Sequence, residues 1–185
     1  MGEIISSLPT AEGTPSFKPT ITPAEEPASL LPGTEPIAAK PSSPMPPATR
    51  IVISSIGVDA KVVELGTKLE NGELVWETPD HAVGHHKGTA NPGEVGNMVL
   101  SGHISSPLRN EGNVFARLPD IAIGALVTVY TDGAQYDYEV KSKRVVLPSE
   151  VSVMDPTPDQ TLTMITCVPN WVYTHRLVVI AKPAA

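Results

Sequence analysis

Short runs of β-branched and other apolar residues, separated by turn residues, follow one another from Arg50 to the end of the chain. This texture is typical of an all-β sandwich or barrel. Asn71-Gly72 and Asp132-Gly133 are strong hairpin signals, because these residue types accept the positive φ of tight turns. The pattern predicts about eight strands, at residues 50–53, 58–63, 73–76, 97–101, 125–130, 135–147, 161–166 and 176–182.

Eight strands within this length favour a closed barrel. Closure removes exposed strand edges, which matters for a chain with so many short apolar strands. Single helical turns are expected around residues 79–83, 114–118 and 149–154. We therefore predict a mainly β fold, an eight-stranded closed barrel with one or two short helices.

The first 49 residues differ in composition from the rest. They hold eleven of the twenty prolines and show neither a helical nor a strand-like apolar period. Such a segment buries too little apolar surface to offset the entropy of ordering it. The sequence therefore predicts a Pro-rich disordered linker at residues 1–49 and one folded domain at residues 50–185.

The charge pattern argues against nucleic-acid binding. The formal net charge is −7, and no cluster of lysine or arginine offers a surface for phosphates.

No run approaches the roughly 20 apolar residues of a membrane span, and the first residues do not resemble a signal peptide. The chain as given is expected to be soluble. A long spacer rich in Pro, Thr, Ser and Glu suits a tethered protein, so we expect a membrane anchor outside the given chain.

Cys167 is the only cysteine, so no internal disulfide can form. It ends the apolar run Thr161–Thr166 and precedes Val168-Pro169-Asn170, which places it at the end of a buried strand. A side chain there is held by a rigid scaffold yet can face a groove, which suits a nucleophile. The alternative is an inert cysteine, because free cysteines are among the most buried residues.

Two more polar residues occupy strand ends. His103 follows the run 98–102, and its imidazole could take a proton from a thiol or protonate a leaving amine. Arg176 opens the last strand, nine positions after Cys167, so an antiparallel return would bring the two side by side. Its guanidinium could stabilise the oxyanion that forms when a thiolate attacks a carbonyl. Taken alone, His103 also fits a histidine with a structural hydrogen bond, and Arg176 also fits a surface arginine paired with a carboxylate.

The order along the chain is more specific than any single residue. Histidine comes first, then cysteine at a strand end, then arginine at the start of the next strand. Papain-like enzymes place the cysteine first, and the sequence Ile165–Pro169 does not match the caspase pentapeptide.

Three stretches resemble motifs of the sortases, bacterial cysteine transpeptidases that attach proteins to the cell wall or to one another. Thr163–Cys167 resembles the Thr-Leu-x-Thr-Cys strand, Leu100–His103 the histidine segment, and Arg176–Val179 the arginine strand. Residues 50–60 resemble the usual opening of the domain. The resemblance covers Arg50 to Pro183.

This resemblance implies a closed eight-stranded barrel and a reaction in two halves. Cys167 would attack the carbonyl of a threonine in a C-terminal sorting signal, and His103 would protonate the departing amine. Arg176 would hold the signal and the oxyanion, and Thr166 and Ser101 are expected to help bind substrate. The thioester would then react with an amine of a peptidoglycan precursor or a pilin lysine. The family also implies a location at the outer face of the cell membrane, with no cofactor.

Three other features of the chain could be given a function. His81, His85 and His86 have metal-binding spacing, but prolines and glycines interrupt any helix, so we expect a solvated loop near the groove. The loop 144–161 carries few acids, which leaves a calcium site unsupported. Residues 31–35 resemble a sorting signal, which chance explains well in a segment of this composition.

Two alternative functions stay open. One is a non-catalytic β-barrel that binds peptides or serves in adhesion, with an inert cysteine. The other is a cysteine protease that uses water as its acceptor. The sequence does not separate cell-wall anchoring from pilin polymerisation.

Overall fold

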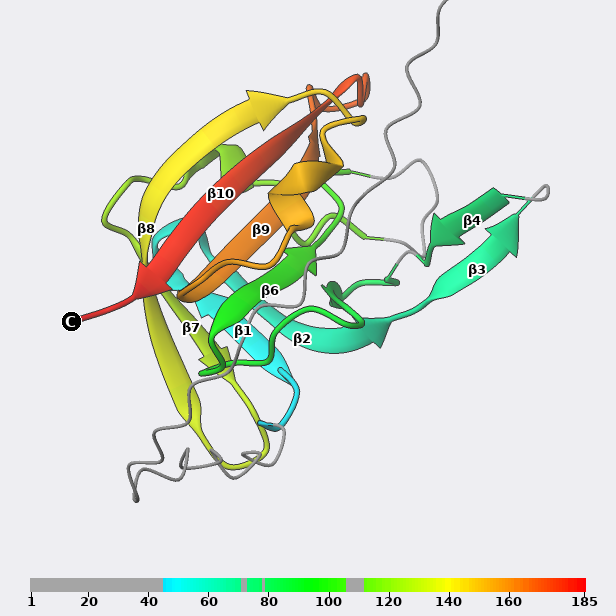
Figure 1. Cartoon of the computed structure of the whole chain (residues 1–185). Helices are drawn as coiled ribbons and strands as arrows, with labels where there is room; N and C mark the ends of the chain where they lie inside the picture. The colour runs from blue at the N-terminus through cyan, green and yellow to red at the C-terminus, as the bar shows by residue number, and fades with distance from the viewer. Residues whose placement is uncertain (1–44, 71–72, 78, 106–111) are drawn as a thin grey trace, which may run out of the picture. The chain divides into compact units, whose positions relative to one another are not determined.

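The computed structural model describes residues 45–70, 73–77, 79–105 and 112–185 (Figure 1). Three features of the sequence analysis therefore lie outside the described residues. They are most of the predicted linker, the segment 31–35 that resembles a sorting signal, and the Asn71-Gly72 turn. Residues just before Arg50 already contact the barrel: Ala48 is buried in the core, and the Met45 amide donates to Glu94 Oε1 at 2.8 Å.

Eight strands close into a barrel in the order β1-β2-β5-β6-β9-β10-β8-β7, which confirms the predicted fold class. Two neighbouring pairs, β2 with β5 and β6 with β9, are parallel, and the other pairs are antiparallel. The barrel strands are β1 (Arg50–Ile53), β2 (Val58–Leu65), β5 (Val83–His86), β6 (Gly96–Ser101), β7 (Leu126–Tyr130), β8 (Gln135–Val146), β9 (Gln160–Val168) and β10 (His175–Pro183).

Buried and exposed side chains alternate along the strands, and the buried apolar side chains fill the barrel interior. In β2, Val58, Ala60 and Val62 are buried, while Asp59 and Lys61 between them are exposed. Alternate side chains of a strand point to opposite faces, so each strand sends its apolar set inward. The connection between β6 and β7 adds further core residues, which are the fully buried Phe115, Leu118 and Ile121.

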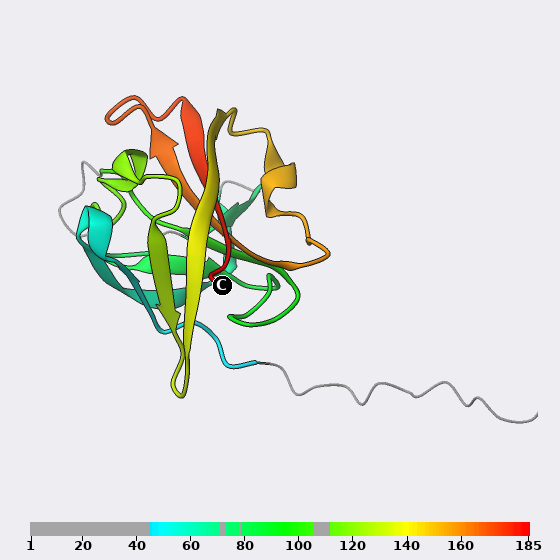
Figure 2. The ribbon, with the colours of Figure 1, turned by 90° about the vertical axis from the view of Figure 1, so that its left-hand side faces the viewer.

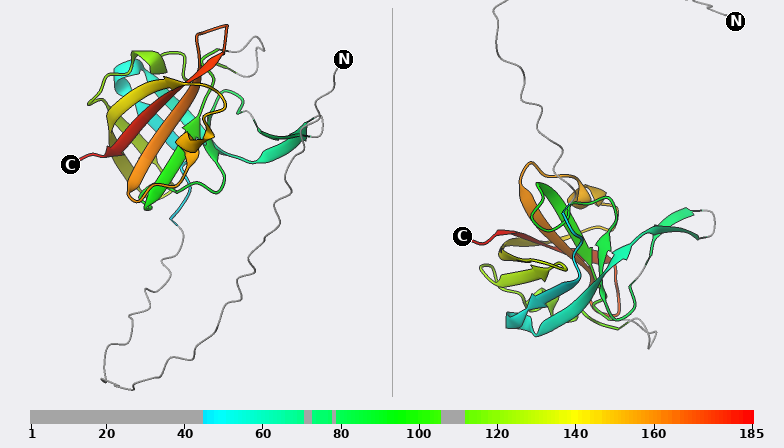
Figure 3. Two further views of the ribbon diagram at one scale, coloured as in Figure 1. Left: turned by 45° about the horizontal axis from the view of Figure 1, so that its top comes forward. Right: turned by 90° about the horizontal axis from the view of Figure 1, so that it is seen from below.

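The predicted strand at residues 73–76 is correct but does not belong to the barrel. It is β4 (Glu73–Trp76), which pairs with β3 (Thr67–Glu70) in a separate hairpin that projects from the barrel (Figure 3). The eighth barrel strand is instead β5, where we expected a helical turn and a solvated loop. Its sequence, Val-Gly-His-His, has no apolar alternation, so its pairing with β2 and β6 defines it.

The expected short helices are single 3₁₀ turns, and the described residues contain no α-helix. η3 (Val151–Met154) lies within the expected range 149–154, and η2 (Leu118–Asp120) begins at the last residue of the expected range 114–118. A further turn, η1 (Ser54–Ile56), was not predicted. Residues 80–82 form bends instead of the expected turn. Figure 2 shows η3 outside the barrel wall, in the connection between β8 and β9.

Candidate active site

Cys167 and Arg176 lie side by side on the outer face of the barrel. They are directly paired in the antiparallel ladder between β9 and β10, as their spacing predicts. Leu162 and Met164 of β9 belong to the core, so the odd-numbered residues of this strand point outward. Directly opposed residues share a face of the sheet, with Cβ atoms about 5 Å apart. The thiol and the guanidinium can therefore act on one group.

His103 lies just beyond β6, the parallel neighbour of β9. Ser101 is level with Ile165, and the Gly102 amide donates to the Ile165 carbonyl at 3.2 Å, so the chain at His103 continues beside Cys167. The Phe115 amide donates to the His103 carbonyl at 2.8 Å. These bonds hold the histidine segment against the cysteine strand.

Gly102, immediately before His103, is required by packing. A Cβ atom at this position would lie 2.8 Å from the Phe115 ring and 2.8 Å from Val114 Cγ1. Because Phe115 is a fully buried core residue, it has little room to move. A side chain at position 102 would therefore displace the segment that carries His103.

The loop between Cys167 and Arg176 is tied to both sides of the site. Arg176 Nη1 donates to the carbonyls of Tyr173 at 3.2 Å and His175 at 3.1 Å, which orients the guanidinium. The Tyr173 hydroxyl lies 2.8 Å from Ser105 Oγ, two residues after His103. One tyrosine thus connects the arginine loop with the histidine loop.

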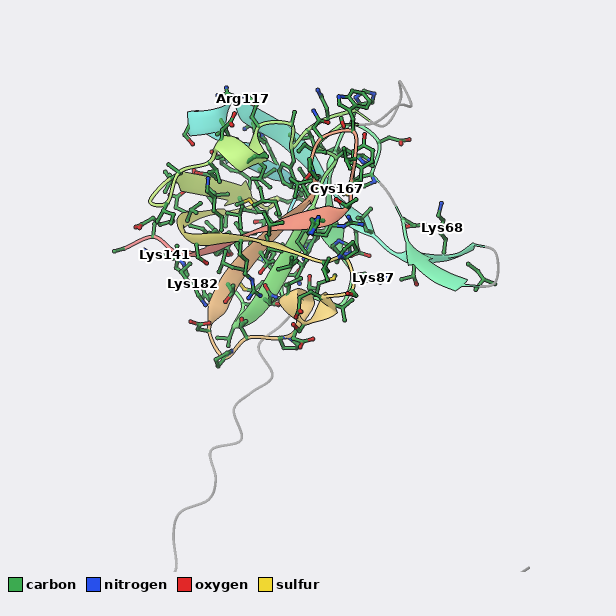
Figure 4. All side chains as sticks on the ribbon, turned by 90° about the horizontal axis from the view of Figure 1, so that it is seen from above. Lys68, Lys87, Arg117, Lys141, Cys167 and Lys182 are labelled. Carbon is green, nitrogen blue, oxygen red and sulfur yellow. The ribbon has the colours of Figure 1, made fainter. Side chains whose placement is uncertain are left out.

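A pocket of about 320 Å³ opens at this site, and every sequence-predicted site residue lines it. Figure 4 looks onto this end of the barrel and shows Cys167 at the end of its strand, with the labelled basic residues spread widely around the domain. The lining residues are Glu77, Pro79, His86, Ser101, Gly102, His103, Val146, Pro148, Glu150, Val151, Val153, Met154, Ile165, Thr166, Cys167 and Arg176.

An apolar wall of this pocket is formed by Val146 at the end of β8 and by Val151 and Val153 in the connection between β8 and β9. Asn97 fastens this connection to the barrel. Asn97 Nδ2 donates to the carbonyls of Val153 at 3.1 Å and Asp155 at 3.0 Å. Its Oδ1 accepts a bond of 2.6 Å from the Thr163 hydroxyl. Asn97 and Thr163 are both buried, so this anchor is shielded from water. Sequence analysis missed Asn97, because no local pattern marks it.

Thr166 and Ser101, the two expected substrate-binding residues, differ in what they contact. Thr166 is 2% exposed, and its hydroxyl donates to the Gly102 carbonyl at 2.8 Å, which links the cysteine strand to the histidine segment. Ser101 Oγ lies 2.9 Å from His86 Nε2. A substrate-binding role stays a prediction for both.

The expected solvated histidine loop is wrong for two of its three members. His85 and His86 lie in β5 with exposures of 4% and 5%, and only His81 is exposed. Burial lowers the pKa of His86 to about 4, with a smaller contribution from neighbouring His85. Burial also lowers the pKa of His85, whose Nε2 lies 3.0 Å from the Ala90 carbonyl. Among the described residues, no group of three or more His, Cys, Asp or Glu could hold a metal ion.

The family model and the similar solved structures given below agree on one family. A family model described as the sortase domain matches residues 51–184. No curated protein matches the chain significantly. Three similar solved structures are as follows. Sortase C-1 from Actinomyces oris is 31% identical, with 74% of this chain and 73% of that chain covered and a TM-score of 0.61. The Clostridium perfringens sortase D5 transpeptidase is 28% identical, with 76% and 79% covered and a TM-score of 0.60. A lid mutant of sortase A from Corynebacterium diphtheriae is 26% identical, with 78% and 73% covered and a TM-score of 0.62.

Proposed function

The chain belongs to the sortase family of cysteine transpeptidases, and from this premise we propose that it cleaves a sorting signal after threonine and transfers the acyl group to an amine. The observation that carries the proposal is the pocket on the outer face of the barrel. Cys167, His103 and Arg176, which come from three different strand ends, all line it. A nucleophile, an acid–base group and a fixed cation around one cavity are the requirements of acyl transfer through a thioester.

In the first half-reaction, the Cys167 thiolate attacks the carbonyl carbon of the signal's threonine and forms a carbon–sulfur bond. The carbonyl oxygen becomes an oxyanion, which accepts hydrogen bonds from the Arg176 guanidinium. His103, as imidazolium, gives its proton to the amide nitrogen as the carbon–nitrogen bond breaks. The products are a thioester on Cys167 and the free amine of the released segment.

In the second half-reaction, an acceptor amine attacks the thioester carbonyl. Neutral His103 takes the proton that the amine loses, and the Cys167 thiolate leaves as the new amide bond forms. The acceptor in this proposal is an amine of a peptidoglycan precursor or a pilin lysine. The apolar wall formed by Val146, Val151 and Val153 supports binding of the apolar part of an extended signal.

The family is generally associated with the cell surface and the membrane. Within the proposal, residues 50–185 act at the outer face of the cell membrane, and residues 1–49 serve as a spacer. In the part of the chain that the structure describes, no helix is long and apolar enough to cross a membrane.

The test is mass spectrometry of the protein incubated with threonine-containing sorting peptides, with and without triglycine. Wild type should gain the mass of the acyl fragment, and triglycine should convert this adduct to a ligated peptide. The control variant Cys167→Ala should form neither product.

Other outcomes separate the alternatives. A hydrolysed peptide with no ligation at any triglycine concentration would show a cysteine protease instead. Peptide binding that survives Cys167→Ala, with no adduct on the folded wild type, would contradict the proposal and favour a non-catalytic binding module.

A further inference from the structure

Four large apolar side chains are exposed at the end of the barrel that carries the active site. Trp171 and Val172, in the loop between β9 and β10, are 64% and 59% exposed. Val145 and Leu147, at the end of β8 and just after it, are 59% and 58% exposed. The first residues of β10 pair with the last residues of β8, so this loop and the end of β8 lie at the same end of the barrel, as Figure 1 and Figure 2 show. We call these four residues the apolar rim.

The apolar rim borders the active-site pocket. Arg176 pairs with Cys167 on one side and with Val146 on the other. Val146 lies between two rim residues in the chain and also lines the pocket. Whatever covers the rim therefore comes close to the thiol.

The loop of the rim has a strained backbone that keeps its shape. Trp171 and Tyr173 have φ values of 65° and 60°, a left-handed conformation that is rare and costly for bulky residues. The Pro169 carbonyl accepts hydrogen bonds from the amides of Val172 at 3.1 Å and Tyr173 at 2.9 Å, which closes the turn. A strained turn that leaves a large apolar ring in solvent indicates a contact outside the molecule.

The charges around the rim are basic, although the chain carries a net charge of −7. The stretches 140–149 and 167–176 contain four lysine or arginine residues and no aspartate or glutamate. They are Lys141, Lys143, Arg144 and Arg176. On either side of the first stretch, the nearest acidic residues are Glu139, which is ion-paired with Lys141, and Glu150. Four basic residues are too few for a nucleic-acid surface, but beside apolar side chains they attract anionic lipid headgroups.

We infer that the apolar rim docks on an anionic lipid bilayer, with Trp171 and Val172 in the headgroup region, and so holds the active-site pocket at the membrane surface. Tryptophan is enriched where membrane meets water, and apolar surface beside basic charge is typical of interfacial binding. An ordinary protein interface takes about 20–30 residues and roughly 800 Å² on each side, far more than these four side chains supply. The inference goes beyond the proposed reaction, because it concerns where the pocket is held.

The experiment measures binding of the full chain to vesicles by flotation. One set of vesicles contains equal parts of phosphatidylglycerol and phosphatidylcholine, and the other contains phosphatidylcholine alone. The rim variants are Trp171→Asn and Val172→Ser, and the charge variant is Arg144→Gln. Asparagine is chosen at position 171 because it accepts a positive φ.

Two control variants are matched to these changes. Val95→Ser alters a valine that is 69% exposed in the connection between β5 and β6, away from the rim. Lys61→Gln removes an exposed positive charge on β2.

Wild type should bind the anionic vesicles, and added salt should weaken the binding. Trp171→Asn should lower the partition coefficient by about tenfold, and Val172→Ser by about threefold, because each removes apolar surface from the contact. Arg144→Gln should lower it by about fivefold on the anionic vesicles only. Both controls should stay within about twofold of wild type.

Fluorescence gives a second reading that needs no change in the rim. The chain has two tryptophans, so Trp76→Phe leaves Trp171 as the only one. Its emission should shift to the blue when anionic vesicles are added, and brominated lipid should quench it.

Three outcomes overturn the inference. They are no binding of wild type to anionic vesicles, equal binding of wild type and Trp171→Asn, and binding without a blue shift of Trp171. A wild-type dimer that Trp171→Asn dissociates, with no binding to vesicles, would mean that a second copy covers the rim instead. Cys167→Ala should bind vesicles as wild type does, so failure of the docking and failure of the proposed reaction are seen separately.

Discussion

Replacing Asn97 with alanine should detach the apolar wall of the pocket from the barrel. The side chain makes three hydrogen bonds, to the Val153 carbonyl, the Asp155 carbonyl and the Thr163 hydroxyl. At about 1 kcal/mol net for each bond, Asn97→Ala should lower the free energy of unfolding by about 3 kcal/mol. For a domain of this size, that loss corresponds to a melting temperature lower by roughly 10 °C.

The measurement is urea unfolding of wild type, Asn97→Ala and the control Asn113→Ala. Asn113 is an exposed asparagine, so its replacement should change the free energy of unfolding by less than about 0.5 kcal/mol. In a peptide assay, Asn97→Ala should raise KM, because η3 (Val151–Met154) would no longer be held in place.

A double variant tests the reasoning more closely. In Asn97→Ala the hydroxyl of Thr163, which is 0% exposed, is left without its partner. Thr163→Val removes this buried hydroxyl at nearly constant shape, so it should restore about 1–2 kcal/mol in the Asn97→Ala background while destabilising wild type. Additive losses, or a loss below about 1 kcal/mol for Asn97→Ala alone, would refute the account of the anchor.

Three further predictions follow from other contacts. The pKa of His86 is lowered from 6.5 to about 4, so the unfolded chain binds its proton first as the pH falls. The free energy of unfolding should therefore drop by up to roughly 3 kcal/mol between pH 6.5 and 4, and urea unfolding of His86→Gln should lack this share of the slope. A Cβ on Gly84 would lie 2.0 Å from Leu65 Cδ1, so Gly84→Ala should cost about 1–3 kcal/mol, which thermal unfolding measures. Adding Leu65→Ala should recover part of that loss, and an unchanged melting temperature for the single variant would contradict the packing argument. Tyr173→Phe removes the bond of 2.8 Å to Ser105 and should lower kcat several-fold with little change in KM or stability; an unaltered kcat would count against a positioning role.

Local sequence patterns were sufficient to predict most of the barrel strands. β2 and β7 alternate or run apolar over several residues, and the long β8 follows a strong turn signal at Asp132-Gly133, so their existence could be predicted without tertiary information. The same holds for Cys167 and Arg176. Their nine-residue spacing, with a loop of turn residues between two apolar runs, predicts the direct pairing that the structure shows.

Local pattern failed where pairing between distant segments decides the structure. β5 has four residues, two of them histidines, and is a strand because β2 and β6 supply its hydrogen-bond partners on either side. A good hairpin signal precedes β4, but no local sequence feature predicts that β4 pairs with β3 outside the barrel.

The sequence by itself determined an all-β barrel domain and the order of histidine, cysteine and arginine at strand ends, because strand periodicity and turn chemistry act over a few residues. Only the tertiary structure decided that His86 is a buried, neutral neighbour of Ser101, and that Asn97 anchors the pocket wall. Burial and long-range hydrogen bonds depend on which strands become neighbours. Which strands become neighbours is determined only when the whole barrel closes, so no short stretch of sequence predicts it.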